Sequence, residues 1–369
     1  MVRPCVAASN NIIFVHALNT FIMGGVHAVR VPLVLLALLV ALFLPVLAHS
    51  ERSGLEEDGI LVIATLTSFA KDIEFLCDDR AQVLSIPPAG VDPHTYSLRP
   101  QDYERLRRAD VIVTTLHTPF EYEVDRLVAQ GELKPEAYIV AYEVPGIALL
   151  ENPMGKPNLH GFLYSPENYV AVIRYIAGVL VELDETGRSL YTERARILET
   201  RALEAMRALE AREELVGIAS TPIAQYVGEA LKIQLALMLT WDPEVPPTPK
   251  SLEHARRLLE SGTVSVALIS GVAESQGEVR PYTAYDRALL ELARTAKIPI
   301  IVIPPPTVDR PLVEIIEQIA SSHASVTTSK GGSMPTGTRP STVALLALGA
   351  AAVLAAASVV YKTRSRRGM

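Results

Sequence analysis

The feature that most constrains the fold of this chain is an alternation between short apolar runs and helical segments. In the first part of the chain the apolar runs are rich in β-branched residues, as buried parallel strands are. They are GILVIATL (59–66), AQVLSI (81–86), DVIVTT (110–115) and AYIVAY (137–142), and helical patterns follow at 100–109 and 121–130. Strands that alternate with helices predict a parallel sheet that helices cover on both faces.

The same alternation returns after residue 214. The runs LVGIAS (215–220), VSVALIS (264–270) and IPIIVIP (298–304) alternate with helical patterns at 222–231, 249–262, 282–296 and 311–322. Residues 165–214 show only helical periodicity, which starts with a capping serine, a proline and an acid. Gly187 is a candidate point of division within this segment. A helical segment of up to ~45 residues would span ~65 Å. The sequence therefore predicts two α/β lobes with parallel sheets, residues 58–164 and 215–320, joined by one long helical segment.

Two charge-free apolar runs, residues 31–48 and 343–360, flank this region. Arg30 precedes the first run, which ends at a small-residue site at Ala48, so residues 1–48 are predicted to be a signal peptide or leader. The long stretch before the run leaves the start open between Met1 and Met23. Cleavage of the run is also open, because an uncleaved anchor would export the following domain equally well.

The second run is long enough to cross a membrane, which predicts a transmembrane helix at 341–361. The basic tail at 362–369, which contains KTRSRR, is expected to stay in the cytoplasm and to leave the domain outside the cell. Residues 321–340 are rich in Ser, Thr, Gly and Pro, so they are predicted to form a flexible stalk. We therefore expect a single-pass protein of the cell membrane with an extracytoplasmic domain.

Charge and cysteine content narrow the class of protein. Of the 34 basic and 41 acidic residues, the segments 1–48 and 341–369 hold six basic and no acidic ones, so the rest carries a net charge of −13. Such a surface repels nucleic acid. Cys77 is alone in the exported region, so no intramolecular disulfide is expected there. The predicted cleavage site has no cysteine, so a lipid anchor is not expected. The sequence contains no Walker loop, nucleophile elbow or CxxC motif, and we predict that it is not an enzyme.

Two histidines stand at positions suited to metal binding. The stretch PPAGVDPHTYSLRPQDYERLRRADVIV (87–113) places His94 on a proline-stiffened loop after the second predicted strand. The stretch NLHGFLYSPENYVAVIRYIAGVLVELD (158–184) places His160 just before the helical segment. Neutral imidazole suits Zn²⁺ and is acceptable to Mn²⁺. Taken alone, His94 is equally compatible with a loop histidine whose ring bonds to the backbone.

Together, these stretches and TPFE (118–121) resemble motifs of the metal-binding substrate-binding proteins of zinc and manganese ABC importers, over roughly residues 58–320. The resemblance implies two lobes bridged by a rigid long helix, with Zn²⁺ or Mn²⁺ held in the cleft between them as the transported ligand. It also implies an ABC permease as the partner. His94 and His160 match the first two metal ligands of the family, and Asp92 is expected to orient the first imidazole.

The second predicted lobe departs from the family pattern. The resemblance implies a third ligand histidine five residues before Tyr226, where this chain has Thr221. It also implies an acidic fourth ligand after the next strand, for which the candidates are Glu274, Glu278 and Asp286. Thr221 is expected near the metal, or as a plain N-cap of the following helix.

Three explanations for the missing histidine remain open. In the first, His117 is its substitute, because it stands at the carboxyl end of a predicted strand, where ligand clefts form. In the second, two histidines act with carboxylates, which would favour Mn²⁺ or Fe²⁺. In the third, metal binding is lost and another solute is bound.

The predicted function is that of an extracytoplasmic solute-binding protein that captures a divalent metal, Zn²⁺ or Mn²⁺, for an ABC importer. One alternative is a degenerate binding protein that serves as a scaffold without metal. Another is a surface metal-dependent hydrolase, because two histidines and an acid with an open position can activate water.

Overall fold

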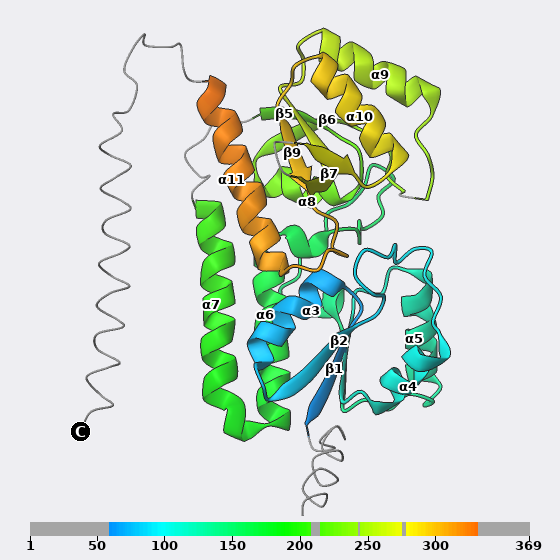
Figure 1. Cartoon of the computed structure of the whole chain (residues 1–369), viewed down its shortest axis with the longest axis vertical. Helices are drawn as coiled ribbons and strands as arrows, with labels where there is room; N and C mark the ends of the chain where they lie inside the picture. The colour runs from blue at the N-terminus through cyan, green and yellow to red at the C-terminus, as the bar shows by residue number, and fades with distance from the viewer. Residues whose placement is uncertain (1–58, 208–214, 243, 275–277, 331–369) are drawn as a thin grey trace, which may run out of the picture. The chain divides into compact units, whose positions relative to one another are not determined.

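The computed structural model describes residues 59–330, apart from 208–214, 243 and 275–277. The predicted leader (1–48), transmembrane helix (341–361) and basic tail (362–369) lie outside the described residues. Within the part of the chain that is described, no helix is long and apolar enough to cross a membrane. Residues 59–330 belong to one compact unit, in which two lobes are seen (Figure 1).

The first lobe is built on a four-stranded parallel sheet, as predicted, and its strand order is β2-β1-β3-β4. Its strands are β1 (Ile60–Ala64), β2 (Ala81–Ser85), β3 (Val111–Thr114) and β4 (Ala137–Val140). Its helices are α3 (Thr67–Cys77), α4 (Pro100–Arg108) and α5 (Pro119–Ala129), of which α3 was not predicted.

Alternating side chains of the central strands enter two separate hydrophobic clusters. Val62 of β1 packs in the cluster that contains residues of α3, whereas Ile63 packs with Leu106 of α4 and Val124 of α5. Because successive side chains of a strand point to opposite faces, an almost continuous apolar run is buried on both sides of the sheet. This burial explains why the strand sequences lack polar alternation.

The second lobe contains a five-stranded sheet in which β6, β5, β7 and β9 are parallel and β8 pairs antiparallel with β7. The strands are β5 (Leu215–Ala219), β6 (Ile233–Met238), β7 (Val266–Ala273), β8 (Val279–Pro281) and β9 (Ile300–Ile303). The helices are α8 (Ile223–Ala230), α9 (Pro249–Glu260) and α10 (Ala284–Thr295). The sequence did not predict β6 or β8, and β8 makes this sheet mixed rather than purely parallel.

The predicted single long helical segment is wrong, because it is two helices that reverse direction. Helix α6 (Pro166–Leu183) begins with Ser165 as its N-cap, as predicted, and α7 (Arg188–Arg207) runs back beside it (Figure 1). A short 3₁₀ turn, η3 (Glu185–Gly187), separates them. Asp184 stabilises the reversal, since its carboxylate pairs with Arg80 of the first lobe at 2.5 Å and accepts from the Tyr191 hydroxyl at 2.8 Å.

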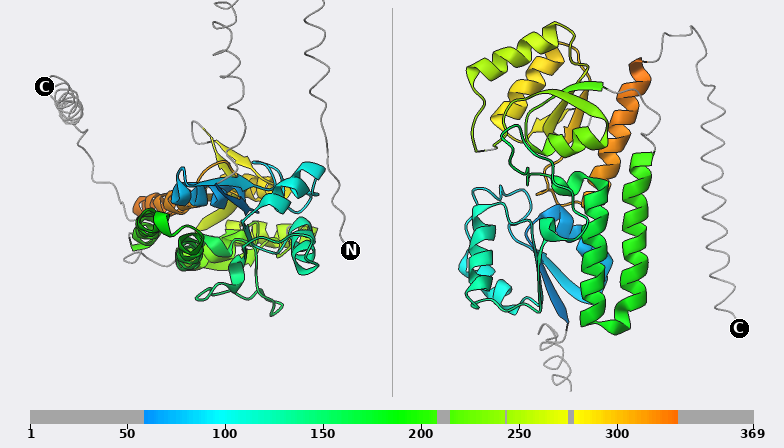
Figure 2. Two further views of the ribbon diagram at one scale, coloured as in Figure 1. Left: turned by 90° about the horizontal axis from the view of Figure 1, so that it is seen from below. Right: turned by 180° about the vertical axis from the view of Figure 1, so that it is seen from behind.

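The predicted stalk begins too early, because α11 (Leu312–Lys330) continues through residues 321–330. The side chains of His323 and Val326 are buried, so packing overrides the weak helix propensity of this Ser- and Thr-rich segment. Helix α11 packs against α7 and α3, and the view from behind shows it beside α7 (Figure 2). The last helix of the described residues therefore packs against the first lobe.

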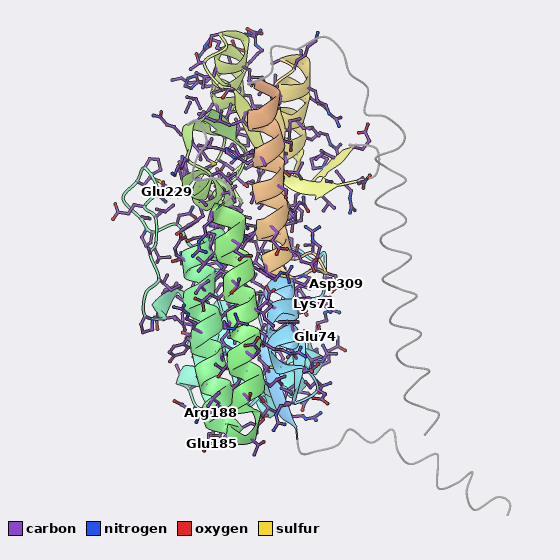
Figure 3. The ribbon with its side chains drawn as sticks, turned by 90° about the vertical axis from the view of Figure 1, so that its left-hand side faces the viewer. Lys71, Glu74, Glu185, Arg188, Glu229 and Asp309 are labelled. Atoms are coloured by element: carbon purple, nitrogen blue, oxygen red, sulfur yellow. The ribbon has the colours of Figure 1, made fainter. Side chains whose placement is uncertain are left out.

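Polar contacts also connect α11 to the first lobe. The buried carboxylate of Asp72 on α3 accepts a hydrogen bond of 2.8 Å from the backbone N–H of Leu312. On the surface, the Lys71 ammonium lies 3.1 Å from Glu74 and 3.4 Å from Asp309, which precedes α11 (Figure 3). The two lobes are thus held together behind the cleft that they enclose.

Candidate metal centre

The carboxyl ends of the central strands face a cavity between the lobes. In the first sheet β1 lies between β2 and β3, and in the second β5 lies between β6 and β7, so each sheet has a switch point where its connections diverge. Ligands of open α/β sheets bind at such points. A cavity of about 100 Å³ lies here. Residues from both lobes line it, among them His94, His117, His160, Thr221, Ser270 and Tyr282.

Three histidines converge at this cavity. His94 lies on the loop after β2, His117 on the loop between β3 and α5, and His160 just before the 3₁₀ helix η2 (Phe162–Tyr164). One ring nitrogen from each lies within 4.8 Å of the other two, and the ring centroids are 5.2–5.5 Å apart. Among the described residues this is the group of three or more potential ligands that could hold a metal ion.

Glu121, at the start of α5, is hydrogen-bonded to the loop that carries His117. Its side chain is 1% exposed and accepts hydrogen bonds from the hydroxyls of Thr65 (2.5 Å) and Thr115 (2.8 Å) and from the backbone N–H of His117 (3.0 Å). Burial alone would raise the pKa of this carboxyl, but interactions with His117 and Thr65 hold the pKa well below its usual range. A buried, ionised carboxylate therefore lies beneath the histidine cluster.

The ring of His117 is oriented through its Nδ1 atom. The Thr115 hydroxyl lies 2.8 Å from Nδ1, and the Oε2 atom of Glu121 lies 3.4 Å from it. Both contacts lie at Nδ1, on one edge of a ring that belongs to the lining of the cavity. Metal-binding histidines usually bond to a carboxylate, carbonyl or water through the nitrogen that does not bind the metal. Glu121 was not predicted, although Thr118 and Glu121 form a capping box whose spacing is readable in TPFE.

Asparagine and glycine fix the position of His160. Its backbone N–H donates to the Oδ1 atom of Asn158 (2.9 Å), whose side-chain amide donates to the carbonyl of Pro222 in the second lobe (3.0 Å). Gly161 has a left-handed φ of 76°, and a Cβ there would lie 3.0 Å from Ile223. Only glycine fits this close approach of the two lobes.

Burial favours the uncharged form of the His94 and His160 rings. It lowers the pKa of His94, which His117 lowers further, and together with His117 and His94 it lowers the pKa of His160 to about 3. Because a metal ion binds the neutral form of imidazole, these two rings are ready to bind without first losing a proton.

The predicted carboxylate ligands do not join the cluster. Glu274 and Glu278 are exposed and pair with Arg280 and Arg294, each at 3.1 Å. Asp286 is fully buried and caps α10, where its carboxylate accepts from the backbone N–H groups of Thr283 (2.9 Å) and Ser270 (3.1 Å). None of the three is among the residues that line the cavity. Their positions are instead explained by ion pairing and helix capping.

Asp92 and Thr221 also differ from expectation. The Oδ1 atom of Asp92 accepts from the backbone N–H of His94 at 3.0 Å, so it shapes the loop rather than bonding the imidazole in the predicted way. Thr221 lines the cavity with 4% exposure, and its hydroxyl has no hydrogen-bond partner among the described residues. It is not the N-cap of α8, since Pro222 occupies that position.

The second lobe brings one carboxylate to the histidines. The Oε1 atom of Glu244, on the loop between β6 and α9, lies 3.6 Å from the Nδ1 atom of His94. Glu244 was not predicted from the sequence. Its loop contains no signal for a metal ligand, and only the folded arrangement of the lobes places it near His94.

Comparison with known proteins identifies relatives of this chain. The family model described as ZnuA, zinc-uptake complex component A, periplasmic, matches residues 62–280. The metal ABC transporter substrate-binding lipoprotein FimA of Streptococcus parasanguinis is 26% identical over 260 residues, which cover 67% of this chain and 82% of that protein. The manganese ABC transporter substrate-binding lipoprotein PsaA of Streptococcus pneumoniae is 28% identical over 240 residues, covering 61% of this chain and 76% of that protein.

Solved structures share the fold. The substrate-binding protein FpvC of P. aeruginosa, in complex with Ni²⁺, superimposes with a TM-score of 0.59 at 19% identity and covers 75% of this chain and 100% of that chain. A crystal structure of ZnuA superimposes with a TM-score of 0.57 at 16% identity and covers 73% of this chain and 99% of that chain. These likenesses confirm the predicted two-lobe α/β fold.

Proposed function

Because the chain belongs to the ZnuA family of periplasmic zinc-uptake components, we propose that it is an extracytoplasmic receptor for a divalent metal ion. In this proposal the ion binds in the cleft between the lobes and is delivered to the permease of an ABC importer. The observation that carries the proposal is the convergence of three imidazole nitrogens within 4.8 Å of one another at the interlobe cavity. The metal-free scaffold predicted as an alternative does not account for this arrangement.

The ion that this site fits best is Zn²⁺. Tetrahedral sites with three histidines are typical of zinc, whereas Mn²⁺ is better served by carboxylate and water oxygens. No carboxylate among the described residues belongs to the group formed by the three histidines. The names of relatives include both manganese and iron transporters, such as MtsA of Streptococcus pyogenes serotype M1, so the proposal rests on the ligand set of this chain.

The ligand set also explains how the chain functions without the third family histidine. His117 lies at the end of β3 in the first lobe and takes the place of the ligand that the resemblance implied at Thr221. The three imidazoles therefore come from the first lobe and its linker, and the fourth coordination position faces the second lobe. A water molecule can fill that position, as in other three-histidine zinc sites.

The proposed location is the outer face of the cell membrane, where the transmembrane helix predicted at 341–361 would hold the protein. Relatives such as FimA and PsaA are lipoproteins by name. The predicted leader of this chain has no cysteine at its cleavage site. A C-terminal helix followed by a basic tail would provide the attachment that a lipid gives those relatives.

A competitive titration of the metal-stripped protein with zinc and with manganese tests the proposal. We expect one zinc ion per chain, bound more tightly than manganese. His160→Ala should weaken zinc binding strongly, because a ligand is lost. His254→Ala, on the exposed face of α9, is the matched control and should leave binding unchanged. Absence of stoichiometric binding by any divalent ion would overturn the proposal.

A further inference from the structure

We propose that Glu244 is a positioning residue of the metal site: its carboxylate accepts a hydrogen bond from Nδ1–H of His94, so that Nε2 faces the metal. This inference rests on the proposed function, since it assumes that His94 binds the ion. It goes beyond that function because it assigns the second lobe a contact with the site that the family resemblance did not imply.

The first observation is the geometry of the contact. The Oε1 atom of Glu244 lies 3.6 Å from Nδ1 of His94, and the His94 side chain is 15% exposed while that of Glu244 is 60% exposed. A hydrogen bond between nitrogen and oxygen requires about 2.7–3.2 Å, so an approach of roughly half an ångström would complete it. The mobile partner is the exposed glutamate, and the fixed partner is the largely buried ring.

The backbone that carries Glu244 is held in a defined turn. Thr240 is 7% exposed, and its hydroxyl donates to the carbonyl of Val245 at 2.8 Å. The backbone N–H of Glu244 donates to Oδ1 of Asp242 at 2.9 Å, and that of Val245 donates to the carbonyl of Asp242 at 3.0 Å. These hydrogen bonds hold the backbone on either side of the Glu244 side chain, which is 60% exposed.

The contact repeats an arrangement already present in the first lobe. Glu121 lies 3.4 Å from Nδ1 of His117, as Glu244 lies 3.6 Å from Nδ1 of His94. In both pairs a carboxylate oxygen lies near Nδ1 of a histidine that lines the cavity. Metal-bound histidines generally donate their second N–H to such a partner, which fixes the ring tautomer and makes the ligand more basic.

Charge gives a second reason for the contact. Three neutral imidazoles bring no negative charge to a divalent ion, and Thr221 of the second lobe is uncharged. The negative side chains whose fields act on His94 are Asp92, Glu121 and Glu244. Only Glu244 belongs to the second lobe. A bound cation attracts its carboxylate, so metal binding should draw the Glu244 side chain toward His94.

The test measures zinc affinity of the full-length chain in detergent for the parent, Glu244→Ala and Glu260→Ala. Glu260 is a matched control because its side chain is 58% exposed and pairs with Arg256 of the same lobe. We expect Glu244→Ala to weaken zinc binding about 10-fold, at the low end of the effect of such partners because the Glu244 side chain is 60% exposed. The metal-free melting temperature should not change, and Glu260→Ala should match the parent.

A second measurement separates positioning from a general effect of charge. Nitrogen-15 NMR of labelled histidine in the zinc-loaded protein should show His94 bound through Nε2 with a proton on Nδ1. In Glu244→Ala that proton should exchange with water faster. Zinc affinity of Glu244→Ala within twofold of the parent, or zinc bound to Nδ1 of His94, would overturn the inference.

The proposed function and this inference can fail separately. If His160→Ala leaves zinc binding intact, the metal site itself is wrong, and the Glu244 proposal is wrong with it. If His160→Ala removes binding while Glu244→Ala has no effect, the function holds and the positioning role is rejected.

Discussion

The Oε2 atom of Glu121 lies 3.4 Å from Nδ1 of His117, which places a fully buried carboxylate directly behind a histidine of the proposed metal site. The same carboxylate caps α5 and accepts the backbone N–H groups of His117 and Thr118, each at 3.0 Å. One side chain therefore both caps a helix and contacts the backbone and ring of His117.

Replacing Glu121 by glutamine should weaken zinc binding as well as stability. The amide group cannot accept all the hydrogen bonds that converge on the carboxylate, so a buried donor is left unpaired at a cost of about 1–3 kcal/mol. Loss of the partner of His117 should reduce zinc affinity roughly 10- to 100-fold. Chemical denaturation gives the first quantity and competitive zinc titration gives the second.

Asp286→Asn is the matched control for that experiment. Asp286 is also fully buried and closes a capping box, with Thr283 at the start of α10, but it is not in contact with the histidines. It should lower stability by a similar amount and leave zinc affinity unchanged. Equal losses of affinity in the two variants would mean that Glu121 acts only through folding.

A second prediction concerns the exchange of a ligand between the lobes. His117→Ala should weaken zinc binding by about 3 kcal/mol, or more than 100-fold, since one of three ligands is removed. Thr221 of the second lobe lines the same cavity, so Thr221→His in that background should restore part of the zinc-dependent rise in melting temperature.

Insertion of a larger side chain at Thr221 also has a structural cost. The residue is 4% exposed, and overpacking a buried position costs about 1–3 kcal/mol. Thr221→His alone should therefore melt at a lower temperature without zinc. A double variant that shows no zinc-dependent shift at all would show that the second lobe does not reach the metal.

The sequence predicted the architecture well where local pattern determines it. Apolar, β-branched runs identified β1, β3 and β9 because both faces of these strands are buried. The strand β6 was missed because its central residues are partly exposed and its apolar run IQLALM is continuous with helix-like sequence. The reversal at Asp184 was missed because helical periodicity is the same in one long helix and in two antiparallel ones.

The site was predictable only in part for a similar reason. His94 and His160 stand in stretches that resemble family motifs, and His117 stands at a strand end, so each carries a local signal. Glu244 carries no local signal. It is 150 residues from His94 in the sequence, and only the packing of the two lobes brings the two side chains together. The acids Glu274 and Glu278 were plausible by position, but their side chains pair with arginines at the surface.

A third prediction concerns membrane topology and rests on the apolar run at 343–360 and the basic tail. Protease added to intact cells should remove the domain and leave a small C-terminal fragment in the membrane. The measurement is immunoblotting with tags at the C-terminus and within the domain. A domain that is protected in intact cells and digested only after lysis would contradict this orientation.

The last prediction follows from Asp72, where α3 meets α11. Burial raises the pKa of this carboxyl to about 8, although the backbone N–H groups of Leu312 and Val313 partly offset the shift. In the unfolded chain an aspartate has a pKa of about 3.9. Between about pH 3.9 and pH 8 the folded protein holds a proton on Asp72 that the unfolded chain has lost, so the free energy of unfolding falls as the pH rises through this range. The contribution of Asp72 to stability is therefore complete below about pH 4. This contribution should fall as the pH rises toward 8, by at most about 1.4 kcal/mol per pH unit.

Asp72→Asn isolates this effect, because the amide keeps a hydrogen-bond acceptor for Leu312 and does not titrate. Urea unfolding of metal-free protein at pH 5, 6.5 and 8 should show the parent losing stability relative to the variant as the pH rises. The difference should level off above pH 8, once Asp72 is ionised in both states. Since Asp72 joins the first lobe to the helix that ends the described chain, its ionisation should loosen the contact behind the cleft. Parallel stability profiles for the two proteins would show that Asp72 is ionised in the folded state at neutral pH, and that the N-terminus of α11 holds it as an anion.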